Sequence, residues 1–379
     1  MTQFTPDSIE EAAERIRGAQ GRETLVATGE RRHLDTAPLA DSSTLVDLGA
    51  FCDTTEHRPG DMTVTVGSRV GFAALQTALA GHGQWLPLDP PAAAATTIGG
   101  LIAADLAGPL RSSQGRVRDH LIGIEVLDGN GARLCSGGRV VKNVAGYDTA
   151  KLHVGACGTL GWILEATFKV RPLPRAEAAL SLDSASPADA ARQAPGLRDL
   201  HEPGWLEIEH DAEGTRLWAA LLGESADVDH GLERWRNAAP GSEEVRDPAS
   251  CRALLADALA PKDRCVVKAA LLPGDLPALL EATTEGADSL YAQPLTGNAR
   301  FLFAHIQEAA DFLLRFRPQV EARGGWLTLE RADAASHAAL AADIAPLGRK
   351  PEGLGLMQGV RAVFDPADVF DKTRTGWAD

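Results

Sequence analysis

The sequence predicts a two-domain α+β protein with a C-terminal tail. Its 379 residues are enough for two domains at about 100–200 residues each. Short strand patterns alternate with amphipathic helix patterns throughout. Prolines interrupt the regular structure at Arg171–Arg175 (RPLPR) and again between Pro346 and Pro351. We therefore expect domains at residues 1–174 and 175–350, and a tail at 351–379 that leaves the second domain and packs elsewhere.

The first domain begins with a helix. Ser8 and Glu11 have the spacing of a capping box, and Ile9, Ala12, Ala13 and Ile16 repeat at helical intervals. An Asp-Gly-Asn-Gly turn at 128–131 predicts a hairpin. The remaining expected elements are strands at 24–28, 44–48, 63–67, 122–127, 133–136 and 162–170 and a helix at 70–80.

The second domain is richer in alanine, leucine and charged residues. We expect strands at 206–210, 216–222, 264–272 and 326–330, and helices at 188–193, 229–238, 248–260, 276–285 and 307–323. His305 falls in an apolar stretch and is predicted to be a buried strand residue. In the tail, Leu356, Val360, Val363 and Phe364 have helical spacing.

The formal charge of −15 argues against nucleic acid or an anionic membrane surface as a partner. No run of about 20 apolar residues predicts membrane insertion, and acidic residues near the start argue against a secretory signal. The five cysteines include no CxxC pair, so neither an iron–sulfur cluster nor another metal site is expected. Five mostly buried, reduced thiols and a cytoplasmic location fit this pattern.

The stretch from Leu86 to Gly115 is rich in glycine, alanine and proline. In it, Thr96-Thr97-Ile98-Gly99-Gly100 precedes a predicted helix of small residues. Backbone amides at a helix start can bind anions, and glycine lets a diphosphate approach closely. One glycine pair alone would favour a simple turn. The clustering of several small-residue segments favours a bound ligand, whereas standard hydrolase, metalloprotease and phosphate-loop motifs are absent.

Five phrases in this order carry a family resemblance: TIGG at 97–100, AGP at 107–109, VRD at 117–119, KNVAGYD at 142–148 and GTLG at 158–161. They resemble the FAD-linked oxidases of the PCMH or vanillyl-alcohol-oxidase type, and within that family the FAD-binding subunits of glycolate oxidases. The similarity is strong over 63–174. It returns at Phe364–Phe370.

The resemblance implies a two-part PCMH-type FAD-binding domain, a smaller α+β cap domain and a tail that returns to the first domain. It also implies one non-covalent FAD, held by Gly29, Pro91, Thr96, Thr97, Ile98, Gly99, Gly100, Ala103, Gly108, Gly115, Val117, Lys142, Tyr147 and Ile163. Lys142 would stabilise the reduced flavin, and Tyr147 would contact its ring. Arg118 and Asp119 would orient the flavin or, alternatively, fix a turn by ion pairing.

The chain departs from the family in two places. Only Gly29 remains of the first glycine-rich loop, and Phe370 is not followed by the usual Asn-Pro-Gly. Arg31 and Arg32 would either compensate by pairing with the diphosphate or be solvated. Because of these departures, a non-catalytic scaffold subunit with a degenerate FAD site is an alternative interpretation of the chain.

The activity implied is oxidation of glycolate, or another small 2-hydroxy acid, to the corresponding 2-oxo acid. The resemblance implies a complex with a larger FAD-binding subunit and an iron–sulfur subunit, cytoplasmic or peripheral to the inner membrane through those partners. A free-standing 2-hydroxy-acid dehydrogenase is a further alternative. No catalytic base is identified. His201, His210, Arg300 and His305 are candidates of equal standing.

Overall fold

The structure is a computed structural model. It describes residues 2–28, 43–49, 52–138, 148–259, 261, 263–283, 286–333, 336, 344–345 and 347–372. The chain divides into two compact units. Unit 1 comprises Met1–Leu106, Gly115–Leu173 and Lys350–Asp379, and unit 2 comprises Ala107–Gln114 and Pro174–Arg349.

Unit 1 begins with a small parallel sheet. Strands β1 (Thr2–Phe4), β3 (Ser43–Asp47) and β2 (Thr24–Thr28) lie in that order. Helix α1 (Ile9–Ala19) starts where the Ser8 side chain accepts a hydrogen bond from the amide of Glu11, as the capping-box spacing predicts. Its small apolar face packs into a core with Leu25 and Phe370.

The second sheet of unit 1 is antiparallel. Its five strands lie in the order β4 (Thr55–Arg58), β5 (Thr63–Gly67), β9 (Trp162–Lys169), β7 (Leu121–Leu127) and β8 (Arg133–Gly137). Strands β7 and β8 form the hairpin predicted around the Asp-Gly-Asn-Gly turn. Helices α2 (Phe72–Ala80), α3 (Ile98–Ala104) and α5 (Val117–His120) belong to this part of the unit.

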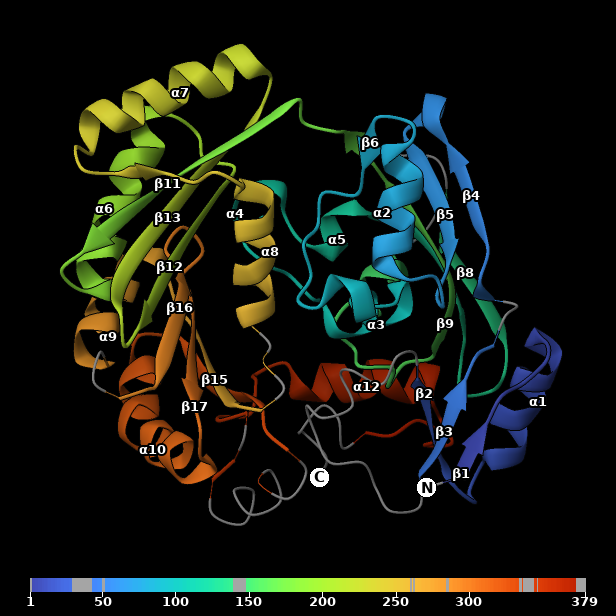
Figure 1. The fold of residues 1–379 in the computed structure, drawn as a ribbon. Helices are drawn as coiled ribbons and strands as arrows, with labels where there is room; N and C mark the ends of the chain where they lie inside the picture. The colour runs from blue at the N-terminus through green and yellow to red at the C-terminus, as the bar shows by residue number, and fades with distance from the viewer. Residues whose placement is uncertain are drawn as a thin grey trace. The chain divides into compact units, whose positions relative to one another are not determined.

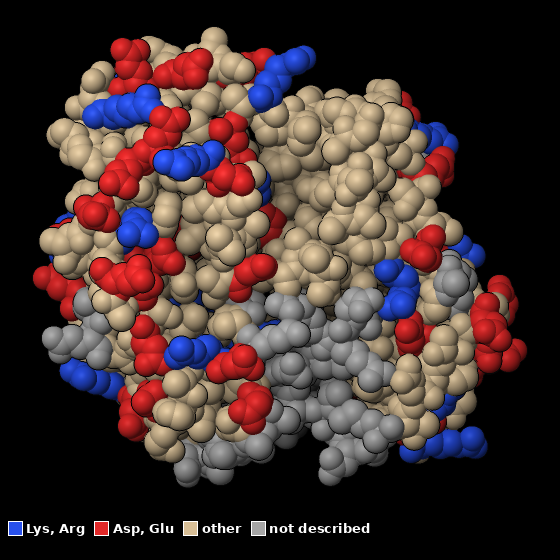
Figure 2. All heavy atoms as spheres, in the orientation of Figure 1, with Lys and Arg blue, Asp and Glu red and all other residues tan. Residues whose placement is uncertain are grey.

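Three further elements complete unit 1. Strands β6 (Gln84–Trp85) and β10 (Arg171–Pro172) pair with each other, and α12 (Leu354–Phe364) lies in the tail. Beyond α12, Phe370 forms a parallel bridge with Leu25 of β2. The surface view shows an area without charged side chains over α2 and α3 (Figure 2), whose sequences contain no Asp, Glu, Lys or Arg.

Unit 2 is built on one antiparallel sheet. The strands lie in the order β14 (Glu243–Glu244), β11 (Ala176–Ser184), β13 (Gly214–Gly223), β12 (Trp205–Asp211), β16 (Ser289–Gln293), β17 (Asn298–Phe303), β15 (Cys265–Ala270) and β18 (Trp326–Arg331). Helices α6 (Pro187–Leu200), α7 (Ser225–Ala238), α9 (Leu276–Thr283) and α10 (Ile306–Ala322) cover one face (Figure 1) and bury the apolar core against it. Short helix α4 (Arg111–Gln114) contacts β12, and α8 (Pro248–Ala258) contacts β11.

The predicted α+β fold is confirmed, with local differences. Strands β11, β16 and β17 were not predicted. All six residues of β17 are buried, so this strand lacks the alternation of buried and exposed residues that marks a half-exposed strand. His305 is not a buried strand residue: β17 ends at Phe303, and His305 is exposed at the N-cap of α10. Two of the five cysteines are buried, Cys52 and Cys265, rather than most of them.

The described residues show neither a metal-binding cluster nor a membrane-spanning helix. No cluster of His, Cys, Asp or Glu among them is arranged to hold a metal ion. No helix in the described part of the chain combines the length and apolar character that crossing a bilayer requires.

Candidate cofactor site

The start of α3 is the predicted diphosphate-binding segment. The Thr97 hydroxyl accepts a hydrogen bond from the Gly100 amide at 3.2 Å and so caps the helix. The amide of Gly99 donates to the carbonyl of Ser68 at 2.8 Å, and that of Ile98 donates to Val70 at 2.9 Å. The expectation that these amides are open to a diphosphate is therefore wrong, because each is already bonded within the protein.

Close packing also explains why residue 99 is a glycine. A Cβ atom there would lie 3.0 Å from the Cβ of Ser68 and 3.2 Å from its carbonyl oxygen. Thr96 is buried, and its hydroxyl donates to the carbonyls of Pro91 and Ala92 at 3.2 and 3.1 Å. The hydroxyls and small residues of this segment thus satisfy the loop and the helix start. Their contact with a cofactor stays a prediction.

A second predicted segment, the GTLG region, lies against α3. The amide of Gly155 donates to the Ile102 carbonyl at 3.0 Å, and that of Cys157 donates to Ala103 at 2.8 Å. Gly155, Cys157, Gly158 and Gly161 all have positive φ, which folds this short run into successive tight turns. Two of the predicted FAD segments, distant in sequence, are therefore neighbours in unit 1.

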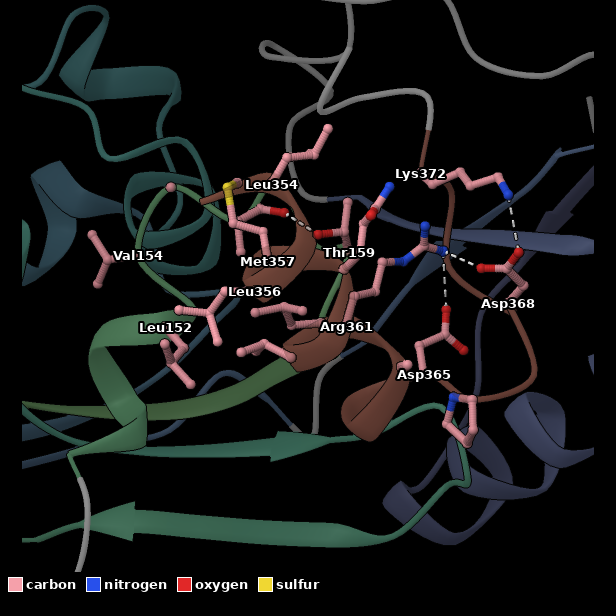
Figure 3. A pocket seen from close by; sticks show the side chains of 17 residues that line it. Leu152, Val154, Thr159, Leu354, Leu356, Met357, Arg361, Asp365, Asp368 and Lys372 are labelled. Carbon is pink, nitrogen blue, oxygen red and sulfur yellow. Dashed lines mark hydrogen bonds and ion pairs between the residues drawn. The ribbon is translucent and has the colours of Figure 1, made fainter. Parts of the chain in front are cut away.

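A pocket of about 710 Å³ opens beside the GTLG segment (Figure 3). One wall is formed by residues 152–160, and the other by α12 and the tail that follows it. Leu152, Val154, Leu356 and Met357 give it apolar surface, and Thr159, Arg361 and Lys372 add polar groups. Its volume and mixed lining are typical of cofactor and small-molecule sites.

Arg361 is the most informative polar residue of this pocket. Its guanidinium contacts Asp365 at 3.4 Å and Asp368 at 2.7 Å, and donates to the carbonyl of Phe370 at 3.0 Å (Figure 3). Its Nε atom is buried and has no hydrogen-bond partner among the described residues. A buried donor left unpaired is costly, so a bound acceptor here would be stabilising. The contact of this pocket with a cofactor stays a prediction.

The other predicted residues fall into three groups. Ile163 and Val117 are buried in the core of unit 1, and Gly115 has a φ of +88° with Asp119 close to the position of a Cβ. The Asp119 carboxylate accepts the Arg116 amide at 2.8 Å, as expected for a residue that fixes a turn. Gly108 belongs to unit 2. Gly29, Arg31, Arg32, Lys142 and Tyr147 lie outside the described residues.

Sequence reasoning missed Arg361 and most of the pocket wall that α12 provides. The helical spacing of the tail was visible, and so was the Phe-Asp-Pro phrase at 364–366. Neither indicated which face of the tail meets the GTLG segment, because that contact joins residues about 200 positions apart.

Comparison with known proteins agrees with this architecture. Over 97% of the chain and 76% of the other protein, the fold matches a solved structure of alkyldihydroxyacetonephosphate synthase, with a TM-score of 0.69 and 15% identity. Glycolate oxidase subunit GlcE of Escherichia coli is 42% identical over 177 residues, which are 44% of this chain and 51% of GlcE. Glycolate oxidase subunit GlcD of Bacillus subtilis is 36% identical over 163 residues, 40% of this chain and 35% of GlcD.

A D-2-hydroxyglutarate dehydrogenase of Stutzerimonas stutzeri is 31% identical over 179 residues, 47% of this chain and 39% of that enzyme. The matches thus span about half or less of these curated relatives. The chain therefore has the same fold as that synthase. Residues 3–135 match the family described as FAD binding domain, and this match supports FAD as the cofactor of that part of the chain.

Proposed function

We propose that this chain is an FAD-dependent oxidoreductase and serves as the FAD-binding subunit of an oxidase complex for glycolate or a related 2-hydroxy acid. The observation that carries this is the FAD-binding domain at 3–135 together with 42% identity to a glycolate oxidase subunit. Two relatives are named glycolate oxidase subunits and a third is named D-2-hydroxyglutarate dehydrogenase, which supports 2-hydroxy acid chemistry.

In this proposal residues 1–174 and 351–379 form the FAD-binding domain and residues 175–350 the cap domain, except that residues 107–114 join unit 2 and so belong with the cap domain. Bound FAD would accept a hydride equivalent from the 2-hydroxy acid. Arg361 would donate to a polar group of FAD through its unpaired Nε. The turns of the GTLG segment would form one wall of the pocket, without bulky side chains. The apolar side chains of α12 would exclude water from the pocket.

The partners we propose are a larger FAD-binding subunit and an iron–sulfur subunit. The names of two relatives as oxidase subunits support an assembly. The described residues contain no metal-ligand cluster of their own to pass electrons onward. The complex would be cytoplasmic, or peripheral to the inner membrane through its partners.

The test of FAD binding is an absorbance spectrum of the purified chain before and after acid precipitation. We expect flavin bands that move to the supernatant, as for non-covalent FAD. Flavin that stays in the pellet would contradict only the non-covalent part. A colourless protein that also fails to take up added FAD would sink the proposal.

Arg361→Leu should lower the flavin content, because it removes the unpaired donor at the pocket wall. Arg58→Leu is the matched control, since Arg58 is an exposed arginine of unit 1 paired with Glu56. Equal flavin content in both variants would remove Arg361 from the site.

A scaffold subunit with a degenerate FAD site is the second candidate. The amides of Ile98, Gly99 and Gly100 favour it, because each is already bonded within the protein rather than free for a diphosphate. The same spectrum separates the two functions, because a scaffold would neither carry flavin nor acquire it.

A further inference from the structure

One face of the unit 2 sheet is apolar and covered by helices, and its other face carries a row of polar side chains across the central strands. Alternate residues such as Ile208, Phe301 and Val267 point into the helix-covered core. The residues between them form a polar row on the other face. In this row, consecutive strands place Glu209 opposite Tyr291, Tyr291 opposite Arg300, Arg300 opposite Lys268 and Lys268 opposite Thr328.

Two cations of this row share one carboxylate. Arg300 contacts Glu330 through two bonds, at 2.5 Å and 3.0 Å, and Lys268 contacts the same carboxylate at 3.0 Å. Burial alone would raise the pKa of Glu330, but Arg300 and Lys268 together lower it to about 2. Glu330 is therefore ionised at neutral pH, and both of its oxygens are already bonded to these cations.

Residues 107–114 bring a third cation to the same face. Although their neighbours on both sides in sequence belong to unit 1, they belong to unit 2. The carbonyl of Gly108 accepts a hydrogen bond from the Gln293 side chain at 3.1 Å, and the Ser113 hydroxyl donates to the carbonyl of Gly204. These two bonds fix the short helix that carries Arg111.

Arg111 has no anionic partner within hydrogen-bond distance in the described part of the chain. Its side chain makes no hydrogen bond or ion pair with any described residue, although it is only partly exposed. Burial lowers its pKa, repulsion from Arg300 lowers it further, and Glu330 opposes these effects only in part. A guanidinium held in such surroundings without an anion is costly, and its planar fork matches a carboxylate.

We propose that this polar face binds a small carboxylate through Arg111, with Arg300 and Lys268 supplying the surrounding positive charge. Resting on the proposed function, this carboxylate is that of the 2-hydroxy acid. Arg111 is the direct ligand because Arg300 is already held by Glu330 in a bidentate pair. Glu330 acts as a positioning residue: it fixes the other two cations without neutralising Arg111.

The test is titration of the full chain with glycolate, followed by thermal unfolding, with and without added FAD. Glycolate should raise the melting temperature, because a ligand that binds only the folded state stabilises it. Glycolamide, a neutral molecule of similar shape, should not. Arg111→Gln should weaken glycolate binding at least about tenfold, the usual value of a charge-assisted hydrogen bond. The matched control is Arg315→Gln, which changes an exposed arginine of the same unit.

Circular dichroism of each variant establishes that it is folded. Equal glycolate binding by folded Arg111→Gln and wild-type protein would overturn the proposal. So would a wild-type response to inorganic phosphate as strong as to glycolate, since that would indicate a general anion site. A colourless protein in which glycolate binding depends on Arg111 would sink the proposed flavin function and leave this site standing.

Discussion

Gly158 and Gly161 show how two glycines of one motif can have different roles. Both have positive φ, +79° and +151°. A Cβ on Gly161 would lie 2.7 Å from the carbonyl oxygen of Leu127, whereas a Cβ on Gly158 would meet nothing within 4 Å. Gly158 therefore needs only a permissive backbone conformation, and Gly161 also needs the missing side chain.

We predict that Gly161→Ala lowers the free energy of unfolding by about 3 kcal/mol or more, and Gly158→Ala by about 1 kcal/mol. The larger effect comes from the clash with β7 added to the backbone strain. Urea unfolding of both variants measures the difference. Equal losses would mean that the contact with Leu127 relaxes freely.

His153 is a buried histidine that the proposed chemistry does not use. It is 4% exposed, and its ring meets Phe364 edge-on at 5.3 Å. Burial lowers its pKa from 6.5 to about 4. The unfolded chain therefore binds a proton more readily than the folded chain between these values, and stability contributed by neutral His153 is present above pH 6.5 and lost as the pH falls toward 4.

We predict that acidification from pH 7 to 4.5 destabilises the wild-type chain more than His153→Gln, by roughly 2–3 kcal/mol. Urea unfolding at the two pH values gives the comparison. The same pH dependence in both proteins would assign the acid sensitivity to other groups.

At the scale of elements, Asp365 ties the tail to the first sheet. Its buried carboxylate accepts the amides of Val369 and Phe370 at 2.8 and 2.9 Å. The Val369 carbonyl in turn accepts the amide of Leu25 at 2.8 Å. One carboxylate thus shapes the turn that follows α12 and sets the position of the tail on β2.

We predict that Asp365→Ala lowers the free energy of unfolding by about 2–4 kcal/mol, because it leaves two buried amides unpaired. Asp368→Ala should cost less than about 1 kcal/mol, since Asp368 is an exposed partner of Arg361 and Lys372. Hydrogen exchange at Val369 and Phe370 should accelerate in the first variant. Unchanged exchange there would show that the turn holds without the carboxylate.

At the scale of the whole molecule, the proposed assembly bears on activity. Among the described residues, nothing singles out a catalytic base, and no metal cluster is present to carry electrons onward. We therefore predict little or no turnover of glycolate or lactate by the isolated, FAD-loaded chain with an artificial electron acceptor. Activity should appear on co-expression with the flavoprotein and iron–sulfur partners.

The measurement is steady-state dye reduction over a panel of small 2-hydroxy acids. Turnover by the isolated chain at about 1–1,000 per second, the usual range for enzymes, would contradict this prediction. A free-standing dehydrogenase would then be the better description.

The sequence by itself determined most of the elements of both units and the FAD-binding domain. The capping box of α1 and the Asp-Gly-Asn-Gly hairpin act over a few residues, and the motif phrases between 97 and 161 are equally local. Local signals of this kind survive in sequence because each depends on near neighbours only.

Only the tertiary structure decided which groups are already satisfied and which are not. The amides of Ile98 and Gly99 donate hydrogen bonds to residues about 30 positions earlier in the sequence. Arg111 interacts electrostatically with Arg300 and Glu330, which lie about 200 positions later. Sheet register and the packing of the tail bring such partners together, and neither is encoded in the periodicity of any one segment. Local signals therefore predict an open cradle at Gly99 and Gly100, whereas the structure leaves the Arg111 side chain and the Nε of Arg361 without a hydrogen-bond partner among the described residues.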